Sequence, residues 1–504
     1  MPNPTIYVAS AGTGKTTALL EILEKLLAHT KPEKIAFTTF TNAGAQELAH
    51  RACLKFPALS EENFRYFRTL HSIAYRSIPY APMVSRSDLI GYGMHSGYPI
   101  TGANAISKKD GNTNQRAGLG DHMLSLDALM RGRQVSAEDI ATTQEVTHFS
   151  ANQIEDFSNK YREYRESLGK YDFTDMLEQF LAVVKRNPLN IDALLVDEAQ
   201  DLSGLQWAII NEMSKHVNDF VVAGDDKQAI YAFNGGQPEI LIDMEGERHV
   251  LDTSYRLPEE VLTYAEGIAD RIKKKQDYTV TSKKPEGTVQ RILGINQLDM
   301  SEGTWFFLAR NRSFLPWIEG ELLKAGVMFE SDSADSILSP DLLECIKSWK
   351  ELRKGFAIPV TMAKEIYGYL KSGSGVKRGG KKMLNAVDDG EWLDKDELTG
   401  QYGLRDTAPW EVMFQLPDRT RDTLVQMDEN GALEEECRVK ITTIHAVKGA
   451  EADNVVLLPD MTYFTETNFR NNPDDEHRVF YVGCTRAKEN LFLHAPLTER
   501  FYQL

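Results

Sequence analysis

The segment Ala9–Thr16, which reads Ala-Ser-Ala-Gly-Thr-Gly-Lys-Thr, constrains the fold of this chain more than any other. It follows the short apolar run Thr5–Val8 and precedes a predicted helix from Lys15 to about Ala28. This is the strand, loop and helix order of a phosphate-binding loop. Glycines let backbone N–H groups surround phosphate oxygens, and the helix start adds the positive end of its dipole. The segment predicts a nucleoside triphosphate site in an α/β domain, although Ala9 stands where the simple pattern has its first glycine.

Two residues of this loop carry charge or a metal-binding oxygen. Lys15 is expected to neutralise the β- and γ-phosphates, and the hydroxyl of Thr16 is expected to bind Mg²⁺. The alternative is a glycine-rich turn without a ligand. The loop alone does not decide between them.

A second cluster of polar residues follows a predicted buried strand. Leu194–Asp201 reads Leu-Leu-Val-Asp-Glu-Ala-Gln-Asp, so the acids begin where the apolar run ends. Asp197 is predicted to hold Mg²⁺, and Glu198 to orient or deprotonate the attacking water. Acids also gather at helix starts because of the dipole, but metal-assisted phosphoryl transfer needs both this cluster and Lys15, and the chain has both.

A third polar segment, Gly224–Phe233, follows the next apolar run. Gln228 is placed to sense the γ-phosphate. Tyr231 and Phe233 are two residues apart, and aromatic faces of this kind stack on bases in proteins that bind single strands. The alternative is that both rings are core residues of an extended segment.

Apolar runs and helical patterns alternate along the chain, as in parallel sheets covered by helices. The fold class is therefore α/β, with a first sheet built from runs near residues 5, 34, 193 and 220. The segment from Ser85 to Gly120 is rich in Gly, Ser, Asn and Thr and predicts an inserted, loop-rich subdomain. A second α/β unit is expected from about Arg248, with its own polar helical insertion between about Ser331 and Glu436.

Composition excludes several classes of protein. Hydrophobic residues make up 42% and charged residues 26%, as in a soluble globular protein. No apolar run approaches the roughly 18 residues that span a bilayer, and the N-terminus enters a strand without a signal peptide, so we expect a cytoplasmic protein. The four cysteines are scattered and predict neither a zinc site nor a redox pair. The net charge of −17 disfavours nucleic acid only weakly, because a narrow strand-binding groove needs only a local positive and aromatic lining.

These three segments belong to a longer series that runs in a fixed order between residues 9 and 487. After the loop, its members are Thr39–Leu48, Arg68–Ser72, Asp172–Asp175, Asp197–Asp201 with Gln206, Gly224–Phe233, Ser254–Arg256, Thr442–Glu451 and Tyr481–Ala487. In this order they resemble the motif series of the superfamily 1 DNA helicases of the UvrD/PcrA/Rep type. The resemblance covers nearly the whole chain.

The resemblance implies two RecA-like motor domains, each with an inserted, mostly helical subdomain. The expected first motor domain comprises residues 1–72 and 150–247, with its insertion at 73–149. The expected second motor domain comprises residues 248–330 and 437–504, with its insertion at 331–436.

The resemblance also assigns roles by position, with ATP and Mg²⁺ as the implied cofactors. The implied catalytic residues are Lys15, Asp197, Glu198, Gln228, Arg256 and Arg486, the two arginines acting as fingers on the γ-phosphate. The implied nucleotide-binding residues also include Ala11, Gly12, Thr13, Gly14, Thr16, Thr17, Tyr255, Gly449 and Glu451, and the implied metal ligands are Thr16 and Asp197. The implied nucleic-acid contacts are Phe40, Thr41, Asn42, Thr69, His71, Tyr231, Phe233, Asn234 and His445. For His445 a structural hydrogen bond at a strand end is the alternative.

Some positions depart from the family pattern. The adenine-reading Gln segment that normally precedes the loop has no room here, and Thr17 and Asn234 stand where relatives often have Arg. We therefore expect relaxed selectivity among nucleoside triphosphates and a weaker cationic contact to the strand. The trimmed ends would suit a phage or mobile-element enzyme, which would act in the host cytoplasm.

The sequence thus predicts an ATP-dependent helicase that moves 3′ to 5′ on single-stranded DNA and unwinds tailed duplex. Alternatives are a translocase that strips proteins from DNA without unwinding, and a DNA-binding subunit whose ATPase has decayed. An RNA strand is not excluded, because stacking and backbone contacts are nearly blind to the sugar. No membrane partner is expected, and protein partners are not predicted.

Overall fold

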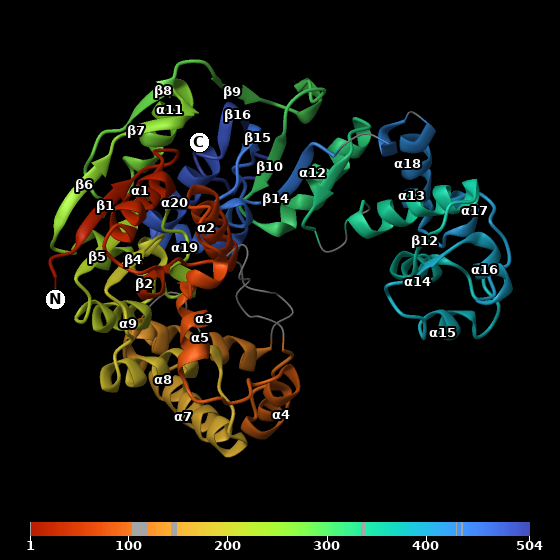
Figure 1. The fold of residues 1–504 in the computed structure, drawn as a ribbon. Coiled ribbons are helices and arrows are strands. Elements are labelled where there is room, and N and C mark those ends of the chain that lie inside the picture. The colour runs from red at the N-terminus through yellow and green to blue at the C-terminus, as the bar shows by residue number, and fades with distance from the viewer. Residues whose placement is uncertain are drawn as a thin grey trace. The chain divides into compact units, whose positions relative to one another are not determined.

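The computed structural model describes residues 2–102, 118–142, 149–333, 336, 338–429, 431–434 and 437–504 (Figure 1). It divides into two compact units. One comprises Met1–Arg291, Leu308–Asn311 and Thr443–Leu504, and the other comprises Ile292–Phe307 and Arg312–Thr442. The four-part division that the family resemblance implies is finer than this one, and it stays a prediction.

The first unit holds a six-stranded parallel sheet. Its strands, in spatial order, are β3 (Tyr66–Arg68), β2 (Ile35–Thr38), β4 (Ala193–Val196), β5 (Asp219–Gly224), β1 (Thr5–Ala9) and β6 (Glu247–Leu251). Strands buried on both faces need apolar side chains throughout, and every residue of β2 and β4 is buried. The sheet continues through Arg248 in β6, the position where the sequence predicts a second α/β unit to begin.

Helices cover both faces of this sheet because alternate strand residues point to opposite sides. Ile6, Leu194 and Val196 pack into one apolar core with residues of α3 (Leu70–Ser77), α8 (Phe173–Arg186) and α9 (Gly204–Ser214). Phe37 and Leu195 face the other way, into a core shared with α1 (Lys15–Leu27) and α2 (Asn42–Lys55). The carboxyl ends of β1, β4 and β5 therefore lie side by side at one edge of the sheet.

The insertion between α3 and α8 is helical. It contains α4 (Arg86–Ser96), α5 (Leu119–Arg133), α6 (Ala137–Thr142) and α7 (Ala151–Leu168). The prediction of a loop over 85–120 is wrong for residues 86–96, where Ser85 and Asp88 form a capping box and Gly97, at φ +76°, ends the helix. The helix escaped detection because it buries only Tyr92 and Gly93 and has little apolar periodicity. Residues 103–117 of the predicted loop lie outside the described residues.

A largely buried ionic cluster joins the helical insertion to α8, which covers one face of the first sheet. Arg131 on α5 forms ion pairs with Asp127, Asp172, Asp175 and Glu178, at 2.5 to 3.2 Å. Arg165 on α7 also forms ion pairs with Asp172 and Asp175. Burial opposes the charge of Arg131, but its hydrogen bond to Glu178 and the charge of Asp127 outweigh it and raise its pKa. The acidic segment Asp172–Asp175 thus has an ion-pair partner in each of two inserted helices, α5 and α7.

Removal of Arg131 should destabilise this unit strongly, because it would leave the buried Asp127 and the half-buried Asp172 and Asp175 without the cation that they share. We expect Arg131→Ala to lower the free energy of unfolding by about 3–5 kcal/mol. Urea denaturation followed by circular dichroism measures this. Arg162→Ala is the matched control, since Arg162 is exposed on α7 and its side chain, within the part of the chain that the structure describes, bonds only Asn159 one turn earlier. A loss below about 1 kcal/mol for Arg131→Ala would contradict the structural role.

A second six-stranded sheet has the order β11 (Phe329–Ser331), β14 (Val439–Thr443), β10 (Trp305–Ala309), β15 (Ala452–Leu457), β16 (Ala487–His494) and β9 (Thr288–Ile292). β11 pairs with β14 and β15 with β16 in parallel. The short strands β7 (Thr253–Pro258) and β8 (Thr281–Lys284) pair separately. With two parallel sheets and covering helices, the predicted α/β class is confirmed.

The second unit contains the helices α12 to α18. They are α12 (Leu315–Lys324), α13 (Pro340–Lys354), α14 (Val360–Tyr369), α15 (Gly380–Leu384), α16 (Lys395–Gly400), α17 (Trp410–Met413) and α18 (Asp418–Glu429). Its core includes Trp349 and Trp410, both buried, whose indole N–H groups donate to the Ala408 carbonyl and to Asp428. Across the described ranges, no helix combines the length and the apolar character needed to cross a membrane.

Candidate active site and nucleic-acid interface

The phosphate-binding loop lies between β1 and α1 in the first unit. Gly12 and Gly14 have φ of +75° and +79°, a region that side chains disfavour. At Gly12 space is also short, since a Cβ atom there would lie 2.6 Å from the Cβ of Arg256. The loop carbonyls are held by β7, because Ser254 Oγ donates to Ala11 O and the Tyr255 N–H donates to Gly12 O, each at 2.9 Å. The loop is therefore fixed from two sides.

Two tyrosines, the half-buried Tyr278 and the buried Tyr481, hold the start of the loop. The Tyr278 hydroxyl donates to Ala9 O at 2.9 Å, and the hydroxyls of Tyr481 and Ser10 are 2.9 Å apart. Lys227, only 1% exposed, lies 4.2 Å above the Tyr278 ring. Sequence reasoning assigned no role to these residues. Tyr481 lay within a quoted motif, but nothing marked Tyr278, which is alone in a polar stretch.

Lys15 lies against the carboxylates that follow β4. Its ammonium group is 2.9 Å from Asp197 and forms an ion pair with Glu198. Burial opposes the charge of Lys15, but these two carboxylates raise its pKa. Burial likewise opposes the charge of Glu198, but Lys15 and Lys448 lower its pKa to about 2. Burial raises the pKa of Asp197.

Glu198 has φ +55°, rare for a residue with a side chain. Its N–H donates to Asp197 Oδ1 at 2.8 Å, and Gln200 Nε2 donates to its Oε2 at 2.6 Å. Backbone strain of this kind is found at functional sites, where the surroundings hold it in place. Here it turns the carboxylate back towards the loop lysine.

The donor set suits Mg²⁺ with a bound triphosphate. Asp197 and Glu198 already share one cation, the Lys15 ammonium, and Thr16 is the first residue after that lysine on α1. No cluster of three or more His, Cys, Asp or Glu side chains suited to a metal occurs within the described ranges. Mg²⁺ typically uses one or two carboxylates, water and substrate phosphates, so Asp197 and Thr16 meet that requirement.

Gln228 is held between an acid and an arginine. Its Nε2 donates to Asp225 at 2.6 Å, and its Oε1 accepts from Arg486 Nη2 at 2.8 Å. Burial, with repulsion from Asp226, raises the pKa of Asp225 to about 7. Burial, with repulsion from Arg256, lowers the pKa of Arg486 to about 9, so the guanidinium remains largely charged at neutral pH. Arg486 thus reaches the residue predicted to sense the γ-phosphate.

Arg256 is the second predicted finger. It pairs with Glu451 at 3.0 Å and donates to Thr485 O at 3.2 Å, while its buried Nε has no hydrogen-bond partner among the described residues. Tyr255 beside it is 68% exposed, as a ring that stacks on a base must be. Gly449, at φ +87°, turns the chain just before Glu451. The remaining loop positions differ, with Ala11 and Thr13 buried and Thr17 exposed.

Lys448 connects the acidic cluster to the next segment and was missed in the sequence. Its ammonium group pairs with Asp201, donates to Gln228 O at 2.6 Å and lies 5.1 Å from the Tyr231 ring centroid. Burial raises the pKa of Asp201 to about 6 despite this partner. The signal was present, since a lysine stands inside the quoted segment Thr442–Glu451, but only the fold brings it to Asp201.

Aromatic rings continue from Tyr231. Phe40 stacks on Tyr231 with centroids 5.0 Å apart, and the Phe233 ring is tilted against Tyr231 with centroids 5.9 Å apart. His445 meets Phe233 edge-on at 5.7 Å and is 3% exposed. Burial, with the charges of Arg310 and Lys448, lowers its pKa well below the usual value, while a hydrogen bond to the Ile230 backbone acts in the opposite direction. The placement of His445 suits the structural alternative, and its contact with a strand stays a prediction.

The other predicted strand contacts gather at the starts of α2 and α3. Thr41 and Thr69 cap these helices, and the Thr69 hydroxyl donates to Asn42 at 3.3 Å. His71 follows on α3, with its ring 6.1 Å from that of Phe173. Asn42 and Asn234 are exposed. Helix starts present backbone N–H groups, which suits phosphate contacts.

A phosphate loop, an acidic strand end, a sensing glutamine and an arginine from a second segment make this the site of a P-loop NTPase. Comparison with known proteins gives the family. The UvrD/REP helicase N-terminal domain matches residues 1–249, and the UvrD-like helicase C-terminal domain matches residues 409–496. The chain belongs to the UvrD/Rep helicase family, as the motif series predicted.

Three relatives show the extent of the likeness. The ATP-dependent DNA helicase Rep of Buchnera aphidicola is 23% identical, over 97% of this chain and 92% of that protein. DNA helicase II of Haemophilus influenzae is 23% identical over 68% of this chain, and the ATP-dependent DNA helicase srs2 of Schizosaccharomyces pombe is 27% identical over 54%. The chain covers 48% and 33% of the lengths of these two proteins.

A side chain at Gly12 should damage the site through geometry alone. We expect Gly12→Ala to lower the rate of ATP hydrolysis about 100-fold, because the new Cβ would displace β7 from the loop by an ångström or so. Steady-state hydrolysis measures this. Gly267→Ala is the control, since no atom lies within 4 Å of its Cβ position in α11 (Glu259–Ala269). Equal rates for Gly12→Ala and the unaltered protein would contradict the close contact between loop and β7.

Proposed function

We propose that this protein is an ATP-dependent DNA helicase that moves 3′ to 5′ along single-stranded DNA. The proposal rests on a chain of contacts between the nucleotide site and the aromatic rings. Arg486 donates to the Gln228 side chain, and Lys448 contacts both the Gln228 carbonyl and the Tyr231 ring. One short segment, Gly224–Phe233, supplies both the nucleotide-facing glutamine and the ring that stacks on Phe40. A helicase needs such a connection, since nucleotide hydrolysis must change the grip on the strand.

The residues divide the work of hydrolysis as follows. Lys15 and the loop N–H groups would hold the phosphates, and Thr16 and Asp197 would hold Mg²⁺, which would supply positive charge against the negative charge of the transferred group. Glu198, charged at neutral pH, orients the attacking water and accepts its proton. Arg486 and Arg256 stabilise the spread negative charge, and Tyr255 stacks on the base. The Lys15 ammonium group, which pairs with Asp197 and Glu198, is the cation that would bind the phosphates.

The strand side uses stacking and helix ends. Phe40, Tyr231 and Phe233 take bases, and Thr41, Asn42, Thr69, His71 and Asn234 contact the backbone. Gln228 and Tyr231 are three residues apart in one segment, and Lys448 contacts both, so a shift of the Gln228 backbone would alter the position of the Tyr231 ring. The names of the relatives support a DNA substrate, and the 3′ to 5′ direction is what the resemblance to the UvrD/PcrA/Rep helicases implies.

The test is hydrolysis and unwinding on matched substrates. We expect single-stranded DNA to stimulate ATP hydrolysis, and a duplex with a 3′ tail to be unwound while one with a 5′ tail is not. Lys15→Ala and Glu198→Gln should abolish stimulated hydrolysis, because they remove the phosphate cation and the water-orienting base. Lys25→Ala, exposed near the end of α1, is the control.

The outcomes separate the alternatives. Near-normal hydrolysis by Glu198→Gln would contradict the site assignment. Movement on bare DNA without unwinding would make the protein a translocase, and absent hydrolysis in the unaltered protein would make it a decayed subunit. Equal activity on RNA-tailed substrates would widen the substrate class to both nucleic acids. A matched comparison of ATP with GTP tests the relaxed base selectivity that the sequence predicts.

A further inference from the structure

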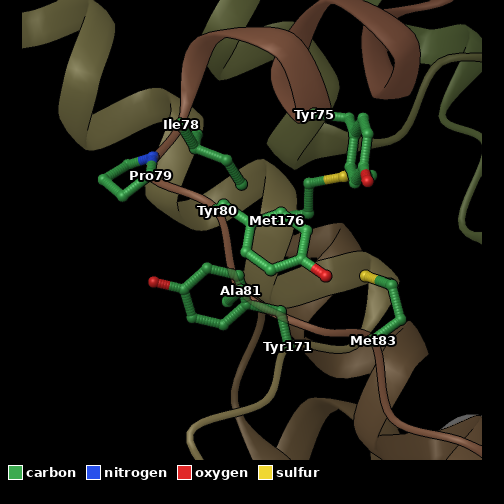
Figure 2. A pocket seen from close by; sticks show the side chains of 8 residues that line it. All are labelled: Tyr75, Ile78, Pro79, Tyr80, Ala81, Met83, Tyr171 and Met176. Carbon is green, nitrogen blue, oxygen red and sulfur yellow. The ribbon is translucent and has the colours of Figure 1, made fainter.

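Two large aromatic side chains near the end of α3 face solvent. Tyr75 is 53% exposed and Tyr80 is 83% exposed. Figure 2 shows both around a shallow hollow, with Tyr171, Met83 and Met176 among its other lining residues. The hollow has a volume of about 10 Å³, which is too small for anything larger than one water molecule. A small-molecule pocket is thus excluded, and the exposed ring faces are what this surface offers.

The rings have a firm backing. Tyr171 N donates to Pro82 O at 3.0 Å, and Val84 N donates to Tyr171 O at 2.9 Å, so the segment after Tyr80 is tied to the start of α8. Met176 on α8 is buried behind them. Pro79 fixes the backbone just before Tyr80. A surface held in this way loses little entropy when a planar ligand stacks on it.

The pair continues the predicted strand-binding face. His71 and Tyr75 are four residues apart on α3, so they lie one above the other on the same side of the helix. The His71 ring meets Phe173, which is itself 61% exposed. Aromatic side chains therefore extend from the start of α3 to its end and on to Tyr80.

The local charge suits a nucleic acid. α3 carries no acidic residue, in a chain with a net charge of −17. Arg76, next to Tyr75, is exposed and forms no ion pair with any residue that the structure describes. Exposed rings beside an available cation are the elements of sequence-independent strand binding.

We propose that Tyr75 and Tyr80 form an accessory stacking platform that takes one or two nucleotides beyond those at Thr69 and His71, with Arg76 on the phosphate between them. The platform rests on the proposed function, because it lengthens the same strand path. It makes the occluded strand longer than the Phe40 and Tyr231 face alone would require.

The first test is the length dependence of binding. Fluorescence anisotropy with labelled oligo(dT) of about 6 to 16 nucleotides covers the range of such sites. We expect the double variant Tyr75→Ala, Tyr80→Ala to bind the longer oligonucleotides about tenfold more weakly or worse, from the loss of stacked bases. The shortest oligonucleotides that the unaltered protein binds should be bound equally by both. Tyr75→Phe with Tyr80→Phe keeps both rings and should bind like the unaltered protein.

A scan with single abasic sites gives the sharper result. In the unaltered protein an abasic site opposite the platform should lower the affinity. In Tyr80→Ala, which has already lost the ring, the same abasic site should lower the affinity no further. If the abasic site lowers the affinity of Tyr80→Ala by the same factor as that of the unaltered protein, the platform proposal is refuted. Phe356→Ala, which removes another exposed ring at 59% exposure in the second unit, is the matched control and should change neither measurement.

Failure of the platform differs from failure of the proposed function. If Tyr231→Ala weakens binding at all lengths while the double tyrosine variant binds normally at all lengths, the platform is refuted and the helicase proposal stands. If the unaltered protein fails to bind single strands, both fail. Thermal unfolding should be unchanged in the tyrosine variants, since both side chains are exposed.

Discussion

The hydrogen bonds that hold the phosphate-binding loop are the contacts on which the remainder of the site depends. Ser254 and Tyr255 bind the loop carbonyls at Ala11 and Gly12, and Tyr278 binds the one at Ala9. Because loop carbonyls accept these bonds, the loop N–H groups stay directed at the phosphate position. The same contact brings Arg256 against Gly12. A loop without these partners would keep its sequence pattern, but Arg256 would no longer be held beside it.

The numbers of acidic and basic side chains at the site are nearly equal, so a charged ligand would change how they pair. Three acids, Asp197, Glu198 and Asp201, share two lysines, Lys15 and Lys448, and none of these side chains is more than 30% exposed. Any group that binds Lys15 must change the balance for Lys448, which also touches Gln228 and Tyr231. Electrostatics at short range can thus couple nucleotide and strand without a long pathway through the fold.

The sequence predicted the parts with strong local signals. The strands around Val8, Val196 and Ala223, the loop and the acidic strand end follow from apolar runs and motif spacing, and the structure has them within a residue or two. Helix α4 was missed because its apolar face is narrow, and Lys448 and Tyr278 were missed because their roles depend on contacts across more than 200 residues. Exposure could not be predicted either, so the burial of His445 and the exposure of Tyr80 needed the fold.

In the helicase proposed above, Lys448 and Gln228 couple nucleotide binding to strand binding. The affinity for oligo(dT), measured with and without a nonhydrolysable ATP analogue in the unaltered protein and in Lys448→Met, tests this coupling. We expect the analogue to change the affinity about fivefold or more in the unaltered protein and to leave it unchanged in the variant. A change of the same size in both proteins would contradict it.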